Sequence, residues 1–432
     1  MLDSLDRNVG RRPFMMVVFL IMACFMTGVA HGQFGQVSGI GDIMNPYYYR
    51  RDLQIITDGL ELDEDQQVFL EVLFFDYEES HARNRKNMLA QITSLKDQME
   101  STNRTQLAQM IFDPFLDQSR RWNEDRDMFL QNLHLMLNEV QRSRWGEFLK
   151  QLRREKEIER GQFSGERIDL DLEIQKLNLD REQQDLIAMT MREYLDILDE
   201  LLIARELASF HCMSTTMNAM ITDNYSAAIP MIEQLTRTQV AVRDHNLSFN
   251  DRIAAELSGT SGPVLHNAIL TAGFPRVFRQ TRAQRVFRDA KKLDLEEGQL
   301  EAIIALETEF LALLHDLNMR IVHLIIDFEP KDMNYRVKKY GLRNSDPPKP
   351  EDASRAAFAE RETLGREYVT RLRAILTPDQ FLEIPDARSF IPREAGAEVA
   401  GSANPKNKLG NEMKRRKRDE KGGGNQFGQK QD

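Results

Sequence analysis

The sequence predicts an all-α protein made of three tandem helical-hairpin repeats of about 117 residues, followed by a disordered tail. Charged residues make up 29% of the 432 residues and aromatic residues only 8%, a balance typical of long solvated helices. Apolar residues recur at alternating steps of three and four, which is the period of an amphipathic helix. A short motif that begins helices also recurs at nearly constant intervals and divides the chain into similar segments.

The first series of this motif has the form Leu-x-Leu, an acidic residue, two further residues and Gln. Its copies are Leu60–Gln66, Leu177–Gln183 and Leu293–Gln299. Successive copies are separated by 117 and 116 residues. A spacing this regular predicts that one structural unit is repeated three times.

A second, looser series recurs in phase with the first. Its copies are Leu137–Gln141, Leu257–Ser261 and Leu376–Gln380, separated by 120 and 119 residues. The middle copy has Ser258 at the expected cap and Ser261 where the other copies have Gln. Two interleaved series with nearly the same period strengthen the prediction of a repeat.

Both series have the chemistry of a helix start. An Asp, Asn, Ser or Thr side chain at the N-cap accepts a hydrogen bond from an exposed backbone N–H, and a Gln three residues later reaches back to the N–H of the N-cap residue. Each motif therefore predicts that a helix begins there. The predicted helix-capping residues are Asp63, Gln66, Asn138, Gln141, Asp180, Gln183, Glu296, Gln299, Thr377 and Gln380.

Long amphipathic helices that pair as coiled coils are expected after each first motif. In the third segment the apolar stripe consists of Phe310, Leu314, Leu317, Ile321, Leu324 and Phe328. Because proline and its polar neighbours interrupt helices, breaks within the hairpins are expected near Asp113-Pro114, near Pro230 and in residues 344–350.

The first 32 residues have the pattern of an export signal. Arg11 and Arg12 precede an apolar run from Phe14 to about Ala30, and small residues follow it. Cleavage after Ala30 or Gly32 is expected, which would place the mature protein in a bacterial periplasm or cell envelope. Two alternatives are an uncleaved membrane anchor and a lipoprotein signal that uses Cys24.

These boundaries divide the chain into six predicted parts. They are a signal peptide (1–32), an N-terminal linker (33–58), repeat 1 (59–160), repeat 2 (161–285), repeat 3 (286–392) and a disordered basic tail (393–432).

Charge is distributed unevenly along the chain. Without residues 1–32 the chain carries 55 Lys and Arg against 66 Asp and Glu, a formal charge of −11, and residues 33–405 alone carry −16. A body this acidic should repel nucleic acid. Basic residues gather instead in Lys414–Arg418, a run that either only solubilises the chain or contacts anionic lipid or the acidic body.

No combination of residues predicts an enzyme or a cofactor, because the sequence has no glycine-rich phosphate loop, no HExxH and no Gly-x-Ser-x-Gly. Soft-metal ligands do cluster at His211, Cys212, Met213 and Met217, and such ligands suit an ion like Cu(I). Met and lone Cys also commonly fill helical cores, and this structural interpretation is favoured. Cys212 would be the only cysteine after signal removal, so no intramolecular disulfide is expected.

The motifs resemble those of a known family. Leu376-Thr377-Pro378-Asp379-Gln380 resembles the LTxxQ motif of the Spy/CpxP-like periplasmic stress proteins, and the first series is similar to that family's first copy of the motif. The resemblance implies curved helical hairpins, usually dimeric, that act as ATP-independent chaperones or envelope-stress sensors, with relatives that bind metals. It also implies that this chain is three such units in a row.

Together these observations predict an exported helical binding protein, an ATP-independent chaperone or envelope-stress protein whose partners are unfolded or other proteins. One alternative is a scaffolding array whose repeats set length and curvature. Another is a metal-responsive periplasmic protein that uses the cluster near His211. An exposed apolar surface would favour the binding protein, and the absence of such a surface would favour the scaffold. Clustered His, Cys and Met side chains would favour the metal-responsive protein.

Overall fold

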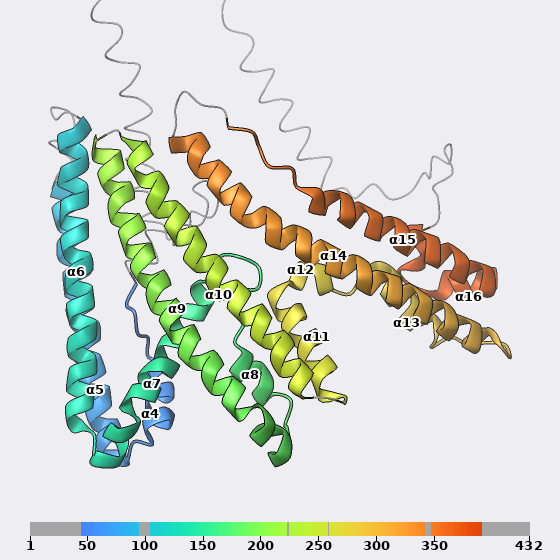
Figure 1. Cartoon of the computed structure of the whole chain (residues 1–432), viewed down its shortest axis with the longest axis horizontal. Coiled ribbons are helices and arrows are strands. Elements are labelled where there is room, and N and C mark those ends of the chain that lie inside the picture. Colours follow the sequence, from blue (N-terminus) through green and yellow to red (C-terminus); the bar gives the residue numbers. More distant parts are fainter. Residues whose placement is uncertain (1–44, 95–103, 223, 258, 342–346, 391–432) are drawn as a thin grey trace, which may run out of the picture. The chain divides into compact units, whose positions relative to one another are not determined.

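The computed structural model describes residues 45–94, 104–222, 224–257, 259–341 and 347–390. These residues form helices joined by short connections, with no strand among them, which confirms the predicted all-α class (Figure 1). The predicted signal peptide and basic tail lie outside the described residues. Within the described ranges, every helix is too short or too polar to cross a bilayer.

The chain divides into two compact units. Among the described residues, the first comprises residues 45–281 and 308–364, and the second comprises residues 282–307 and 365–390. The boundary between the units therefore falls inside two long helices of the third predicted segment. The threefold repeat and its segment boundaries remain predictions.

The first helical hairpin of unit 1 pairs α5 (Glu64–Ser94) with α6 (Arg104–Met136), and α4 (Asp52–Leu60) and α7 (Glu139–Glu157) pack near its base (Figure 1). Its core is rich in aromatic side chains. Phe74, Tyr77 and Phe129 lie in mutual contact, with ring centroids 5.4–6.2 Å apart. α6 and α7 also pack against the next hairpin, so their outer surfaces are partly covered.

The second hairpin pairs α9 (Arg181–Thr222) with α10 (Ile229–Glu256), and its core includes the fully buried Tyr194. The expected break near Pro230 is confirmed, because α10 begins there with proline in its first turn. The flanking elements are η2 (Ile158–Arg160), α8 (Leu170–Gln175), η3 (Tyr225–Ala228), α11 (Ser261–Gly273) and α12 (Pro275–Phe278).

Unit 1 is completed by the parts of α14 (Gln299–Gly341) and α15 (Ala353–Ile375) that fall within residues 308–364. The predicted stripe is largely buried here, since Leu317 and Ile321 pack against Leu270 and Phe274 of the preceding elements. Of the interruption expected at residues 344–350, the described residues 347–350 are non-helical, as predicted.

Unit 2 contains α13 (Arg282–Ala290), the remaining turns of α14 and α15, α16 (Pro378–Glu383) and η4 (Ala387–Phe390). Val286, Phe287 and Leu372 are fully buried in it. An ion pair of 2.6 Å between Arg285 and Asp386 joins its first and last elements.

Two sequence-based expectations about helix ends are wrong. α6 continues through Pro114, which loses a backbone hydrogen bond and destabilises a helix interior. The neighbouring Phe112 and Phe115 are buried, and the free energy gained by their packing outweighs this loss. α14 begins at Gln299, not directly after Glu296, since Gly298 adopts a left-handed φ of 84° and delays the helix.

Candidate functional site

The two motifs of the first hairpin meet at its base through their glutamines. Asp63 Oδ1 accepts the Gln66 N–H at 2.9 Å, and Gln66 Oε1 accepts the Asp63 N–H at 3.1 Å. Asn138 and Gln141 form the same capping box at the start of α7. The Gln66 and Gln141 side-chain amides then donate to each other, each Nε2 lying 2.8 Å from the other Oε1.

Every hydrogen-bonding position of these two amides is used. Gln66 Nε2 also donates to the Met136 carbonyl at 3.1 Å, and Gln141 Nε2 also donates to the Glu61 carbonyl at 3.2 Å. Each amide oxygen accepts one backbone N–H and one side-chain N–H. A primary amide has two donor hydrogens and two acceptor sites, so both side chains are fully satisfied. We call this arrangement the motif amide pair.

The same arrangement recurs within unit 2. Gln299 and Gln380 donate to each other at 3.2 Å, and they also donate to the carbonyls of Ile375 and Asp294 at 2.8 Å. Thr377 and Gln380 form a capping box, whereas at the start of α14 Gln299 Oε1 accepts the Glu296 N–H at 2.8 Å and no return bond to the Glu296 side chain is seen among the described residues.

The middle copy differs from the other two. Asp180 and Gln183 form the reciprocal bonds at the start of α9, but Gln183 Nε2 donates to the Ser261 hydroxyl at 3.0 Å. The expected cap Ser258 lies outside the described residues. α11 begins at Ser261, and its N-cap Thr260 makes no side-chain capping bond, so the expected helix start is displaced.

The motif amide pair predicts a strong energetic coupling between Gln66 and Gln141. Replacing either residue with Ala leaves polar atoms of the other without a partner, and we expect each single substitution to lower the free energy of unfolding by about 1–3 kcal/mol. The double substitution should cost less than the sum, because it removes both amides at once. Urea unfolding of the four variants of the cycle measures this coupling. Additive losses would show that the two amides do not interact.

The structure separates the candidate metal ligands. His211 lies on the exposed face of α9, whereas Cys212, Met213 and Met217 are buried. Cys212 packs with Ala208 and Leu235, and its burial raises the pKa of its thiol. Among the described residues, no group of three or more His, Cys, Asp and Glu side chains is placed to hold a metal ion.

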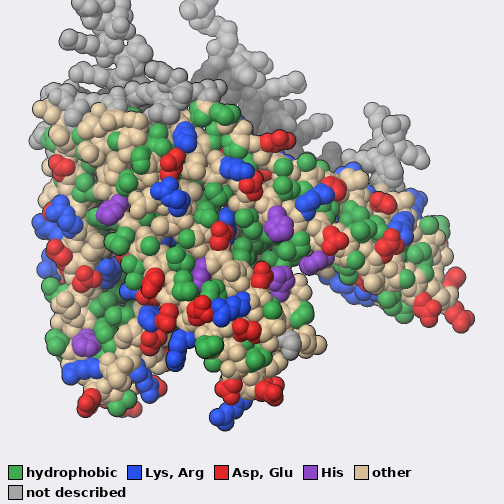
Figure 2. Space-filling model, viewed as in Figure 1, with side chains coloured by type: hydrophobic (Ala, Val, Ile, Leu, Met, Phe, Trp, Pro, Cys, Tyr) green, Lys and Arg blue, Asp and Glu red, His purple; other side chains and the backbone are tan. Residues whose placement is uncertain are grey.

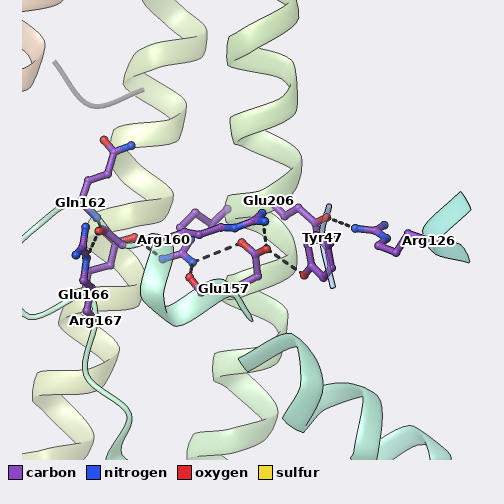
Figure 3. A network of polar contacts seen from close by, with 10 residues as sticks. Tyr47, Arg126, Glu157, Arg160, Gln162, Glu166, Arg167 and Glu206 are labelled. Carbon is purple, nitrogen blue, oxygen red and sulfur yellow. Dashed lines mark hydrogen bonds and ion pairs between the residues drawn. The ribbon is translucent and has the colours of Figure 1, made fainter. Parts of the chain in front are cut away.

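A cluster of buried charges that the sequence analysis missed lies where α7 meets α9 (Figure 3). Arg205 of α9 is 4% exposed and donates to the carboxylate of Glu166, which is fully buried, at 2.6 Å. It also donates to the backbone carbonyl of Glu157, whose own carboxylate lies 3.6 Å away. A single guanidinium thus faces two buried carboxylates.

Further polar groups surround this buried arginine. Glu166 accepts the backbone N–H groups of Gln162 and Phe163 at 2.7 and 3.0 Å (Figure 3). Glu157 accepts hydrogen bonds from the Tyr47 hydroxyl and the Arg160 guanidinium at 3.1 and 2.9 Å. These bonds offset much of the cost of removing the carboxylates from water.

The segment 161–169, which connects the first hairpin to the second, is held on several sides. Asn246 of α10 donates to the carbonyls of Gly165 and Glu166 at 3.3 and 3.2 Å. Glu329 of α14 accepts two hydrogen bonds from Ser164, at 2.9 and 2.6 Å, and burial raises the pKa of its carboxyl group. The segment therefore fixes the packing of several helices within unit 1.

The surface feature with the clearest binding chemistry is an exposed row of apolar side chains on α5. It consists of Val68, Phe69, Val72 and Phe75, which are 68%, 48%, 52% and 63% exposed. We call it the α5 apolar stripe. Since helix residues rotate by about 100° each, Val72 lies about 160° from the core residues Leu70 and Phe74. α5 is thus apolar on two opposite faces, and only one of them is covered by described elements.

Related positions are exposed and apolar after the first motif of the other segments. Phe69 and Val72 follow Gln66 by three and six residues, and Leu186 and Met189 follow Gln183 by the same intervals. Leu186 is 55% exposed and Met189 is 78% exposed. The corresponding residues after Gln299 are Ala302 and Ala305, which are also exposed. The first two segments therefore share an exposed apolar position pair, and on α5 Val68 and Phe75 extend it to a row of four.

Elsewhere among the described residues, α14 also has exposed apolar side chains on one face, but Leu300, Ile304 and Leu311 are less exposed, at 44%, 47% and 40%, and more widely spaced than the α5 apolar stripe. Figure 2 shows one face of the molecule, on which acidic, basic and apolar side chains are interspersed. The signal for the α5 apolar stripe was present in the sequence, because Val68, Val72 and Phe75 follow the helical period. Their series is out of phase with the core series of Leu70, Phe74 and Tyr77.

Comparison of the chain with protein-family models, with curated protein sequences and with solved structures gives no match.

Proposed function

We propose that the chain is an exported helical binding protein that holds unfolded or partner proteins without nucleotide. The observation that carries this proposal is the α5 apolar stripe, which lies opposite the core and is more than one-third exposed at every position. Two Val and two Phe side chains in adjacent turns form a surface that gains free energy when a partner removes them from water. A scaffold whose only role is to set length would not need this surface.

Export and the stress-protein resemblance support the same proposal from the sequence. Arg11, Arg12 and the apolar run that follows them have the pattern of a signal, and Leu376–Gln380 resembles the LTxxQ motif. The metal-responsive alternative has less support, because His211 and Cys212 differ so strongly in exposure.

Suppression of client aggregation tests the proposal. The purified protein, at stoichiometric amounts and without nucleotide, should reduce light scattering by a chemically unfolded client. The substitutions Val72→Asp and Phe75→Asp together should weaken client binding by a hundredfold or more, since each removes a side chain whose burial is worth about 1.5–3 kcal/mol.

A matched control is Met128→Asp on α6, because Met128 is 58% exposed but lies outside the α5 apolar stripe. This variant should protect clients as well as the unsubstituted protein. Circular dichroism should show equal helicity for all variants. If the helical, soluble protein protects neither basic nor acidic clients, the scaffolding array becomes the better account.

A further inference from the structure

The α5 apolar stripe is bordered by acidic side chains of the same helix. At about 100° per residue, Asp65, Asp76 and Glu79 lie within about 40° of Val72 around the helix axis, so they share its outward face. Asp65 precedes the stripe, while Asp76 and Glu79 follow it, and all three are exposed. Glu64 and Glu71 lie along one edge of the stripe.

Most of this negative charge is uncompensated within the described part of the chain. Glu71 pairs with Arg50 at 2.8 Å, and Glu79 pairs with Arg83 at 3.1 Å. Asp65 and Asp76 have no ion-pair partner among the described residues. From Glu64 to Glu79, α5 contains no Lys or Arg, so every charge that this part of the helix itself contributes beside the stripe is negative. Basic residues appear on the helix only from Arg83 onward.

We propose that the occupant of the α5 apolar stripe is a cationic amphipathic helix of another protein. This inference rests on the proposed binding function and specifies the class of partner. The rise of 1.5 Å per residue places Asp65 and Asp76 about 16 Å apart along α5, with the apolar side chains between them. A partner helix with two apolar turns, flanked on both sides by turns that contain Lys or Arg, would complement an apolar surface that has acidic residues at both ends.

A second copy of the same chain fits this surface poorly. Two antiparallel α5 helices centred on Val72 would place Asp65 of one copy beside Glu78 and Glu79 of the other, and the like charges would repel. A parallel pair would align identical acidic residues. The charge pattern therefore selects a basic partner over self-association.

Fluorescence titration with two labelled peptides tests the inference on the full mature chain. The first is an amphipathic helix of about 16 residues with leucines spaced three and four apart and lysines in its first and last turns. The second has Glu in place of each Lys. We expect the cationic peptide to bind at least about tenfold more tightly, and added salt should reduce the difference.

Two sets of variants locate the binding. Asp65→Asn, Asp76→Asn and Glu79→Gln together should weaken the cationic peptide about tenfold, and Val72→Asp should weaken it further. The matched control is Glu124→Gln, Asp316→Asn and Glu362→Gln, which removes the same charge from exposed positions elsewhere in unit 1 and should leave the affinity unchanged.

Several results would overturn the inference. They are equal affinity for both peptides, an equal effect of the control set, and a dimer that Val72→Asp converts to a monomer. Peptide binding seen only after truncation at Phe390 would also overturn it, since the occupant would then be this chain's own basic C-terminal sequence. Peptide affinity and client protection are separate readouts, so a failure of this inference can be distinguished from a failure of the proposed function.

Discussion

Replacing Arg205 with Leu should lower the free energy of unfolding by about 3–5 kcal/mol, as expected when one partner of a buried ion pair is removed. Glu157 and Glu166 are 3% and 0% exposed, and without the Arg205 guanidinium Glu166 would lose its cationic partner, while among the described residues Glu157 would keep only Arg160 at 2.9 Å. Neither can turn toward water without disrupting the end of α7 or the segment 161–169. Urea-induced unfolding followed by circular dichroism measures the loss.

An exposed ion pair provides the matched control for this prediction. Arg252 pairs with Glu193 at 2.7 Å, and their side chains are 43% and 46% exposed. Arg252→Leu should therefore cost less than about 1 kcal/mol. Adding Glu166→Gln to Arg205→Leu should recover part of the lost stability, because it removes one uncompensated charge. A loss for Arg205→Leu no larger than that for Arg252→Leu would contradict the assigned role.

A single methyl group at Gly262 should also be strongly destabilising. A Cβ atom built at Gly262 would lie 2.1 Å from the carbonyl oxygen of Ala254, at the junction of α10 and α11. A backbone atom cannot rotate away as a side chain can, so one of the helices must shift. Pro263 follows directly and disfavours helical backbone for any preceding residue other than glycine. Gly262→Ala should cost about 1–3 kcal/mol or more.

The same substitution at Gly146 should have the opposite effect. Gly146 lies in α7, and a Cβ atom there would meet no atom within 4 Å. Gly146→Ala should therefore raise the free energy of unfolding by about 0.5–1 kcal/mol, since alanine is the better helix residue. Thermal unfolding should give Gly262→Ala a lower melting temperature than the unsubstituted protein and Gly146→Ala a higher one. Equal melting temperatures would show that α11 can move away from α10 at little cost.

Local signals in the sequence were sufficient to predict several helix starts. α7 begins directly after Asn138, and α16 begins directly after Thr377, because the capping box depends only on residues within one turn. The same rule failed at Glu296, where Gly298 lies between the motif and the helix. The break expected at Pro114 failed for a different reason, since packing of Phe112 and Phe115 keeps the helix continuous.

The contacts that define the candidate sites depend on residues far apart in the chain. Arg205 and Glu166 are ordinary charged residues in their own segments, and only the packing of α9 against the segment 161–169 makes them a buried pair. The Gln66–Gln141 contact joins residues 75 positions apart. The sequence identified both glutamines as helix-capping residues, but it had no signal for the bond between them.

The export signal and the basic tail were predicted from residues that lie outside the described ranges, and both remain predictions. The α5 apolar stripe could have been predicted from its helical period. The core series alone does not reveal it, because the second apolar face follows the same helical period on the opposite side of α5.

The motif amide pair also has a consequence for the order in which the first hairpin folds. Each capping box is local, so α5 and α7 can each nucleate with their own cap soon after the chain begins to fold. The amide pair instead closes a loop of 75 residues and can form only when α5 and α6 have already docked. Contacts that form after the rate-limiting step contribute to slow unfolding and little to fast folding. We therefore expect Gln66→Ala to speed unfolding of the first hairpin and to leave its folding rate nearly unchanged, which stopped-flow unfolding and refolding rates would measure.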